Sequence, residues 1–141
     1  LAACALSGLS TLSGPRHGEA AMSAVSYLRA ALNGAPNVLS EPIPAIGHAL
    51  YPEGDPRAKA LVRWLKLPPD LNRVIRAAER NGGKPANIDM ALAAFCLQFD
   101  LPDDAPFLIF AAGRLGGWIA HAMEQSRSGK MIRPRAKYLG D

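Results

Sequence analysis

Residues 103–112 read Asp-Asp-Ala-Pro-Phe-Leu-Ile-Phe-Ala-Ala and open the longest helical pattern of the chain. An acidic residue followed by proline is typical of a helix start, and the apolar run behind it covers nearly the whole circumference of a helix. We therefore expect one helix from this start to about Ser128, buried inside a larger body. Strand signals are nearly absent from the rest of the chain, so the sequence predicts an all-α fold.

Apolar residues at helical spacing, with proline at starts and glycine at ends, predict further helices. They cover residues 18–33, about 55–65, about 70–83 and about 87–99. The chain begins with Leu-Ala-Ala-Cys-Ala-Leu, which reads as the inside of a helix and favours a piece of a longer protein. The loop over residues 35–54 is rich in proline and is expected to be rigid, while residues 129–141 are expected to form an extended basic tail.

The composition limits the partners of the chain. With 141 residues it has the length of one domain, and a net charge of +4 suits an anionic small molecule as well as a nucleic acid. The basic residues are scattered and are not interleaved with aromatic residues, so we expect no nucleic-acid binding by this segment. No apolar run reaches about 18 residues, so no membrane partner is expected.

The cysteines and histidines indicate neither a disulfide framework nor a metal centre. Cys4 and Cys96 lie in apolar runs, which predicts buried free thiols in a reducing compartment and hence a cytoplasmic protein. The two cysteines and three histidines lack the spacing of a metal site, so no metal is expected.

Short polar motifs stand between and inside the predicted helices. In chain order they read Gly-Pro-Arg-His-Gly at 14–18, Ile-Gly-His-Ala-Leu-Tyr at 46–51, Asp-Pro-Arg-Ala at 55–58, Asn-Ile-Asp at 87–89, Gly-Arg-Leu-Gly-Gly-Trp-Ile-Ala-His at 113–121 and Arg-Pro-Arg at 133–135. Taken singly, each has an ordinary interpretation: a histidine in a turn or loop, an acid at a helix N-terminus, or a solvated arginine. Together and in this order, they resemble the C-terminal part of a citrate synthase, over about residues 6–140.

The resemblance implies an acyltransferase of the tricarboxylic acid cycle that condenses acetyl-CoA with oxaloacetate to citrate and CoA. The reaction runs by enolisation, an aldol-type attack and hydrolysis of the thioester. The CoA thioester is a substrate, and no cofactor is bound permanently.

The resemblance also implies a multi-helical, two-domain dimer. Residues 1–17 would end a segment of the large domain, residues 18–104 would form a small domain that closes over the substrate, and residues 105–141 would be the C-terminal helix and tail of the large domain. The expected partner is a second copy or the N-terminal half of the same enzyme. This chain alone is expected to be incomplete as a catalyst.

The chemistry needs a carboxylate base for the methyl group and donors for the thioester and ketone oxygens. By resemblance, Asp89 is the base, His17 is the donor on the enol side and His48 is the donor on the ketone side. The helix start directly after His17 favours a neutral imidazole, whose N–H would be the donor. Two positions depart from the family pattern: Glu19 places an acid two residues after His17, and Ala49 replaces an arginine directly after His48.

Three arginines complete the site that the resemblance implies. Arg57 follows His48 by nine residues, which is the family spacing. Arg114 follows Asp89 by 25 residues, again as in the family. With Arg133, which would reach in from the partner subunit, they would hold the carboxylates of oxaloacetate and citrate, because a guanidinium binds a carboxylate with two parallel hydrogen bonds. Arg114 interrupts a strongly apolar helix, so we expect it to be buried against an anion.

The loop around Gly47 and Ala49 would line the coenzyme A site, and the absence of arginine at Ala49 should weaken that contact. Three alternatives stay open. A citryl-CoA lyase would run the chemistry backwards and share these motifs. A 2-methylcitrate synthase would use propionyl-CoA with the same residues, since one methylene is worth only about 1–3 kcal/mol of discrimination. A non-catalytic interaction domain would keep the fold and have drifted at Glu19 and Ala49.

Overall fold

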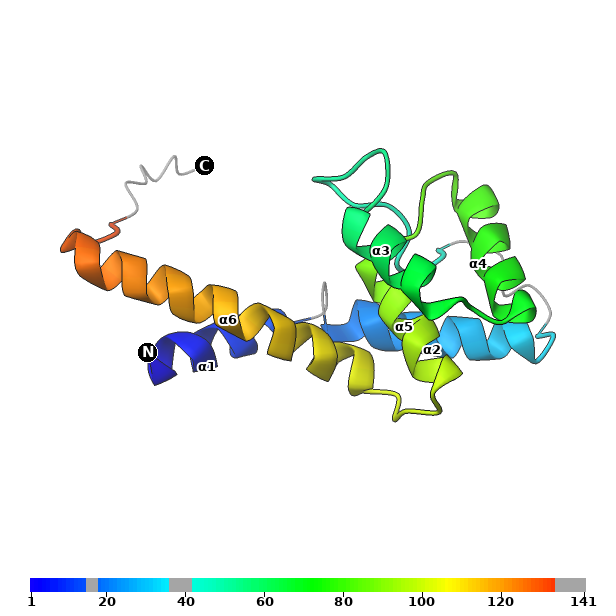
Figure 1. Ribbon diagram of the computed structural model, residues 1–141, viewed down its shortest axis with the longest axis horizontal. Coiled ribbons are helices and arrows are strands. Elements are labelled where there is room, and N and C mark those ends of the chain that lie inside the picture. Colours follow the sequence, from blue (N-terminus) through cyan, green and yellow to red (C-terminus); the bar gives the residue numbers. More distant parts are fainter. Residues whose placement is uncertain (15–17, 36–41, 134–141) are drawn as a thin grey trace, which may run out of the picture.

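The computed structural model describes residues 1–14, 18–35 and 42–133, and this part of the chain forms six α-helices and no β-strand. The helices are α1 (Ala2–Leu12), α2 (Gly18–Leu32), α3 (Pro56–Leu65), α4 (Pro69–Gly82), α5 (Ile88–Gln98) and α6 (Ala105–Ser128). Each segment expected to be helical is helical, so the predicted all-α fold is confirmed. Figure 1 shows two parts: α2 to α5 form a body, and α1 and α6 run side by side as an arm that extends from it.

Side-chain caps fix where two helices of the body begin. At α3, the Asp55 carboxylate accepts the backbone N–H of Arg57 at 3.0 Å, and Pro56 stands at the first helical position. At α5, the side-chain oxygen of Asn87 accepts the backbone N–H of Asp89 at 3.0 Å. Such caps satisfy backbone donors that have no partner inside the helix. The motifs Asp-Pro-Arg and Asn-Ile-Asp therefore define helix starts as well as candidate site residues.

Helix α5 is the centre of the body. It packs against α2, α3 and α6, and residues 90–94 within it are all buried. The apolar core that it shares with α2 and α4 includes Leu28, Ile75 and Met90. Because tightly packed neighbours enclose α5, its first turn, which carries Asp89, has a rigid support.

The arm depends on a close approach of its two helices. A Cβ atom at Gly8 of α1 would lie 2.7 Å from the Trp118 ring on α6, so glycine is needed at this contact. An ion pair connects the body to the start of the arm: the Arg29 guanidinium near the end of α2 donates two hydrogen bonds, of 2.8 and 3.0 Å, to Asp103.

Apolar side chains on the arm are uncovered in the single chain. The exposed ones include Leu6 and Leu9 on α1 and Leu108, Ile109, Leu115 and Met123 on α6. We expected α6 to be buried, but only its residues Pro106 and Ala111 are. The other described residues of this chain do not cover the rest of the helix. Even so, no helix within the described ranges is long and apolar enough to cross a membrane.

The two free thiols lie in different surroundings. Cys96 of α5 is buried as expected, and this burial raises the pKa of its thiol to about 11, with a further contribution from the charge of Asp103. Cys4 of α1 is exposed, so its predicted burial is wrong for this chain. The apolar run around Cys4 belongs to the uncovered arm, which explains the difference.

Leu28 and Leu32 give a matched test of the core, because they lie one turn apart on α2. Leu28 is 0% exposed and Leu32 is 41% exposed. We expect Leu28→Ala to lower the free energy of unfolding by about 2–5 kcal/mol through lost burial and a residual cavity. Leu32→Ala should cost less than about 1 kcal/mol. Urea denaturation followed by circular dichroism measures both, and equal losses would contradict this position of the core.

Candidate active site

Two segments far apart in the sequence lie side by side at the site. Ile46 and Ala86 form an isolated antiparallel bridge. The Gly47 N–H donates to the Pro85 carbonyl at 2.8 Å. His48 directly follows the first segment and Asp89 closely follows the second. This pairing therefore brings the loop of His48 to the start of α5.

A glycine is needed at the bend before His48. Gly47 has a φ of +76°, in the left-handed region that favours glycine. A Cβ there would also lie 2.8 Å from the Lys84 side chain. Ala49, on the other side of His48, is exposed. The bend thus turns His48 out of the paired segment while its neighbour faces solvent.

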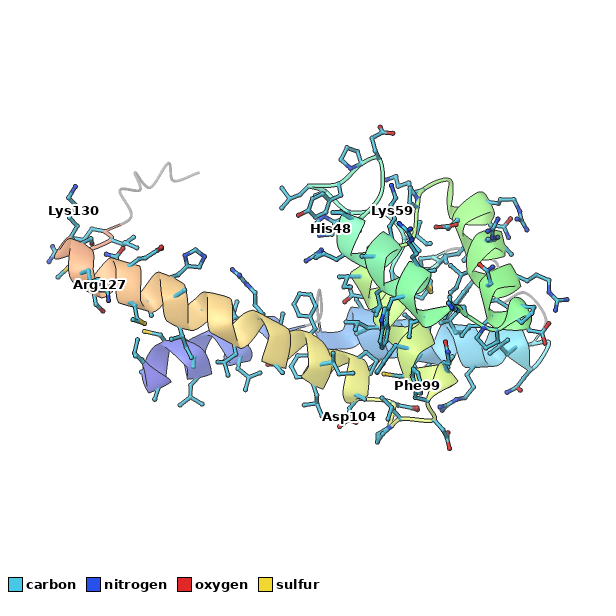
Figure 2. All side chains as sticks on the ribbon, in the orientation of Figure 1. His48, Lys59, Phe99, Asp104, Arg127 and Lys130 are labelled. Atoms are coloured by element: carbon cyan, nitrogen blue, oxygen red, sulfur yellow. The ribbon has the colours of Figure 1, made fainter. Side chains whose placement is uncertain are left out.

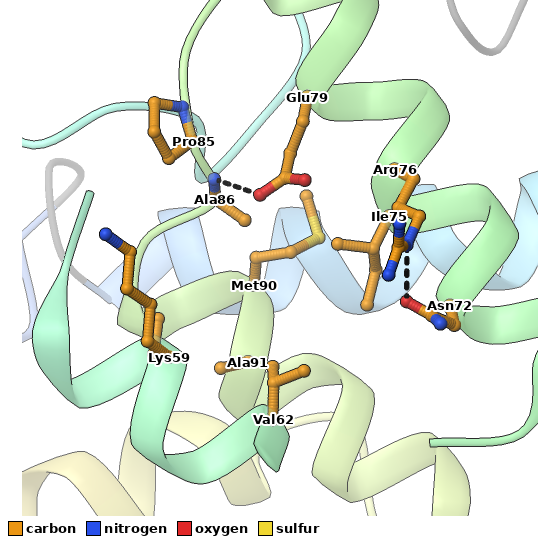
Figure 3. Close-up of a pocket in the computed structure, with 11 residues that line it drawn as sticks. Lys59, Val62, Asn72, Ile75, Arg76, Glu79, Pro85, Ala86, Met90 and Ala91 are labelled. Carbon is orange, nitrogen blue, oxygen red and sulfur yellow. Dashed lines mark hydrogen bonds between the residues drawn. The ribbon is translucent and has the colours of Figure 1, made fainter. Parts of the chain in front are cut away.

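A partly open pocket lies beside the second segment. It has a volume of about 210 Å³, lies between α3, α4 and α5, and has Ile75, Met90 and Ala91 in its wall. Figure 3 shows the Glu79 carboxylate reaching across from α4 to accept the Ala86 N–H, at 3.0 Å. Ala86 is therefore held by Ile46 on one side and by Glu79 on the other.

The surroundings of His48 determine which of its nitrogens is a donor. The Leu50 N–H donates to Nδ1 of His48 at 3.1 Å, and on this contact we assign the proton of the neutral imidazole to Nε2. The ring stacks against Tyr51 with the ring centres 4.9 Å apart. Figure 2 shows His48 on the side of the body that faces the arm. The imidazole is thus oriented with Nε2–H available to a ligand.

Arg57 is held by a buried carboxylate. Its Nε and Nη2 donate to the two oxygens of Asp55 at 2.9 and 2.8 Å, and Asp55 is only 1% exposed. Asp55 also accepts the Ile88 N–H at 3.1 Å. Burial alone would raise the pKa of Asp55, but the hydrogen bonds from Arg57, its charge and the Ile88 amide together lower it. The hydrogen bond to Asp55 raises the pKa of Arg57 against the effect of burial, and the charges of Tyr51 and Asp89 add to it.

His48 and Arg57 form a pair of donors. Nη2 of Arg57 lies 3.2 Å from Nε2 of His48. A guanidinium has no acceptor, and Nε2 carries the imidazole proton, so the two groups cannot satisfy one another. Both can donate to one carbonyl or carboxylate group placed beside them. The arrangement is therefore suited to an oxygen ligand that carries or develops negative charge.

Arg57 and Arg114 face the same space between the body and the arm. Two neighbouring hollows, of about 550 and 330 Å³, both have Arg57, Phe110 and Arg114 in their walls. The larger hollow is also lined by Trp118, and the smaller one by Ile88. Arg114 is exposed rather than buried, which corrects the expectation from its apolar helix, because the single chain leaves this face of α6 open.

The space between the body and the arm, lined by Arg57 and Arg114, is called the cleft below. The remaining candidate residues do not all lie at this cleft. Asp89 is half-buried in the first turn of α5, near enough to Arg57 for their charges to interact. Arg133 lies beyond the far end of α6, where its Nε is 3.0 Å from the Met131 sulfur. His17 lies outside the described residues. The structure therefore brings His48, Arg57 and Asp89 together, adds Arg114 from the arm, and leaves Arg133 apart.

Asp55 and Tyr51 have roles at the site that the sequence analysis did not assign. Asp55 caps the start of α3, and the same carboxylate accepts hydrogen bonds from the Arg57 side chain. Tyr51 stacks on His48 and lies under the guanidinium of Arg57, whose central carbon is 5.5 Å from the ring centre. An acid two residues before an arginine, across a helix-starting proline, is the signal that points to Asp55. Within the described ranges, no three His, Cys, Asp or Glu side chains gather into a group that could hold a metal ion.

The buried Asp55 predicts a pH-dependent stability. Its folded-state pKa is lowered from the ordinary value of 3.8, so its stabilising contribution is complete above that value and is lost as pH falls through the folded-state pKa. We expect Asp55→Asn to cost about 1.5–3 kcal/mol of unfolding free energy at neutral pH. The gap to wild type should shrink below about pH 4. Urea denaturation across this pH range measures the gap.

Asp103→Asn is the matched control, because Asp103 also makes a two-point pair with an arginine but has a side chain that is 57% exposed. An exposed pair contributes about 0–1 kcal/mol. If the Asp55→Asn gap stays constant down to about pH 3, the buried carboxylate is not its source.

A sequence model of the family "Citrate synthase, C-terminal domain" matches residues 1–135. The chain is 31% identical over 162 residues to a citrate synthase of Haloferax volcanii, covering 96% of this chain and 41% of that protein. It is 33% identical over 156 residues to a 2-methylcitrate synthase of Shewanella oneidensis, covering 97% and 41%. The chain thus spans about two fifths of the length of these relatives.

Among solved structures, the citryl-CoA lyase of Hydrogenobacter thermophilus superposes with a TM-score of 0.73 at 24% identity, covering 97% of this chain and 64% of that one. At this identity the likeness concerns the fold. The family match, however, runs through every motif of the candidate site up to Arg133. By its sequence and its helical architecture, the chain belongs to the citrate synthase family.

Proposed function

We propose that the protein containing this chain condenses acetyl-CoA with oxaloacetate to give citrate and CoA. The strongest support is the pair of donors at His48 and Arg57, whose Nε2 and Nη2 atoms lie 3.2 Å apart beside the helix start of Asp89. Oxaloacetate carries a carboxylate directly next to its ketone. A neutral donor beside a cationic one suits those two neighbouring groups.

The proposed steps follow from the chemistry of three side chains. Asp89 takes a proton from the methyl group of acetyl-CoA, and His17, assigned by the family resemblance, donates to the thioester oxygen of the resulting enol. The enol carbon then attacks the ketone carbon of oxaloacetate. Nε2–H of His48 donates to the ketone oxygen, which becomes the hydroxyl group of citryl-CoA. Water finally cleaves the thioester to give citrate and CoA.

The arginines and the loop before α3 complete the proposal. Arg57 and Arg114 would hold carboxylates from opposite walls of the cleft, and Arg133 would come from a partner subunit. Gly47 and Ala49 would contact coenzyme A, which enters as a substrate and leaves as a product. Because both cysteines are free, we place the reaction in the cytoplasm, within the tricarboxylic acid cycle.

A second candidate is a 2-methylcitrate synthase. It is favoured by the 33% identity to such an enzyme from Shewanella oneidensis. Propionyl-CoA differs from acetyl-CoA by one methylene. A pocket for the acyl group discriminates between two such substrates by only about 1–3 kcal/mol. The ratio of kcat/KM for the two thioesters decides between the candidates.

Replacing the proposed base tests the reaction. Asp89→Asn keeps the shape of the side chain and removes the base, so release of CoA thiol from acetyl-CoA and oxaloacetate should fall by about 10²- to 10⁴-fold. The assay should use the protein expressed from its complete reading frame, with propionyl-CoA in parallel. Asp70→Asn is the control, because Asp70 also lies in the first turn of a helix, α4, and has an exposed side chain.

The control should keep wild-type activity. If wild type, Asp89→Asn and Asp70→Asn are equally inactive with both thioesters at every pH tried, the chain is a non-catalytic member of the family.

The uncovered arm predicts association. Leu115 on α6 is 39% exposed within an apolar face, and we propose that a second copy, or the N-terminal part of the same enzyme, covers it. At micromolar concentration the 141-residue chain on its own, without the N-terminal part, should sediment as a dimer or larger. Leu115→Glu should shift it towards monomer, because association would then bury an unpaired charge. Trp64→Glu is the control, since Trp64 is 72% exposed on α3 of the body. A clean wild-type monomer would contradict the proposal.

A further inference from the structure

Asn87 makes three hydrogen bonds that connect the two halves of the candidate site. Its backbone N–H donates to the Ala45 carbonyl at 3.0 Å. Its side-chain Nδ2 donates to the Gly47 carbonyl at 3.0 Å. Its side-chain Oδ1 accepts the Asp89 N–H at 3.0 Å. One amide side chain thus reaches 40 residues back along the chain and two residues forward.

The two side-chain contacts end beside the two groups of the proposed chemistry. Gly47 directly precedes His48, and its carbonyl belongs to the peptide group from which the His48 residue starts. Asp89 is the residue whose own N–H is capped. Since a carboxamide carries a donor and an acceptor at fixed separation, Asn87 sets the loop of His48 and the first turn of α5 relative to each other.

We propose that Asn87 is a positioning residue, which aligns the ketone-side donor His48 with the base Asp89. Its catalytic consequence rests on the proposed function. The hydrogen bond from Asn87 to the Gly47 carbonyl, here called the tether, holds the segment directly before His48. The stretch after His48 has bonds within itself, from Leu50 to His48 and from Gly54 to the Tyr51 carbonyl at 3.0 Å, and one bond from α3, in which Nζ of Lys59 donates to the Glu53 carbonyl at 2.8 Å. Before His48 the attachment to the body is the bridge, and Asn87 supplies the side-chain part of it.

Substitutions at Asn87 can separate the helix cap from the tether. Asp and Ser are both good N-caps, so Asn87→Asp and Asn87→Ser keep the acceptor for the Asp89 N–H. An ionised Asp has no donor for the Gly47 carbonyl, and the Ser hydroxyl is on a shorter side chain and serves the cap. Because only Asp adds charge, an effect common to both variants comes from the lost tether. Asn87→Ala removes both contacts.

Two reactions report on the two ends of the tether. Proton exchange at the methyl group of acetyl-CoA in D₂O, with malate bound in place of oxaloacetate, needs Asp89 but no attack on a ketone: the base removes a proton and the enol takes back a deuteron. Citrate formation also needs the His48 donor. In the complete protein, Asn87→Asp and Asn87→Ser should keep the exchange within a few-fold and lower citrate formation by about 10- to 100-fold.

Asn72→Ala is the matched control. Asn72 also pairs its side-chain amide, by accepting from Nε of Arg76 at 3.3 Å, but it lies on α4 away from the bridge, as Figure 3 shows. This variant should leave both reactions at wild-type rates. Asn87→Ala should lose citrate formation and in addition melt at a lower temperature, because the cap of α5 is gone.

A readout that needs no activity keeps this inference separate from the proposed function. The Leu50 amide donates to His48 inside the tethered loop, and the Gly47 amide lies in the bridge. Hydrogen exchange at these two amides should be faster in Asn87→Asp and Asn87→Ser than in wild type or Asn72→Ala. If a wild type without activity still shows this pattern, the proposed reaction fails and the tether stands.

Three results would overturn the proposal. The first is amide hydrogen exchange at Gly47 and Leu50 that is unchanged in both Asn87→Asp and Asn87→Ser. The second is citrate formation at the wild-type rate in both. The third is an equal loss of methyl proton exchange and citrate formation, since that would mean a general disturbance of α5 and no selective effect on His48.

Discussion

The buried carboxylate of Asp55 accepts hydrogen bonds from two helix starts and from one guanidinium. A carboxylate that is 1% exposed loses its hydration, and this loss is offset only if its oxygens find enough donors. Asp55 finds them in the Arg57 amide, the Arg57 side chain and the Ile88 amide. Negative charge is also favoured at a helix N-terminus, and here two such ends meet. The starts of α3 and α5, and hence Arg57 and Asp89, are placed by this one group.

The donors around Asp55 are therefore oriented before any ligand arrives. Nε and Nη2 of Arg57 donate to Asp55. Nη2 also lies next to Nε2 of His48, on the side of the guanidinium that faces away from Asp55. His48 is fixed in turn by the Leu50 amide and the Tyr51 ring. Donors that are held by the scaffold need no reorganisation when charge develops on a ligand oxygen, which is the condition for electrostatic stabilisation of a transition state. The part of the site that lies in the body is thus rigid, and it is made of short loops and helix starts.

The sequence predicts the helices well because caps, prolines and glycines act locally, as at Asp55 and Asn87. The motif spacings also predict the candidate residues, since they select a family whose fold brings such positions together. Local signals cannot show that Ile46 pairs with Ala86 across 40 residues, so the roles of Asn87 as a tether and Asp55 as a clamp become visible only in the structure. The exposed Cys4 and Arg114 were expected to be buried because apolar periodicity indicates a face that needs covering. It does not say whether the cover belongs to the same chain.

The cleft is divided between the body and the arm, whose helix α6 packs against α5 and α2. Arg57 belongs to the body and Arg114 to the arm, so a ligand with two carboxylates that bound both would favour the arrangement in which the two cations are nearer. A ligand can shift such an equilibrium only by its difference in affinity for the two arrangements. The Arg29–Asp103 pair at the junction, with side chains that are 48% and 57% exposed, adds only about 0–1 kcal/mol to that packing. A ligand that met both arginines would favour their closer approach against the packing of α6, whereas a ligand that met only Arg57 would not.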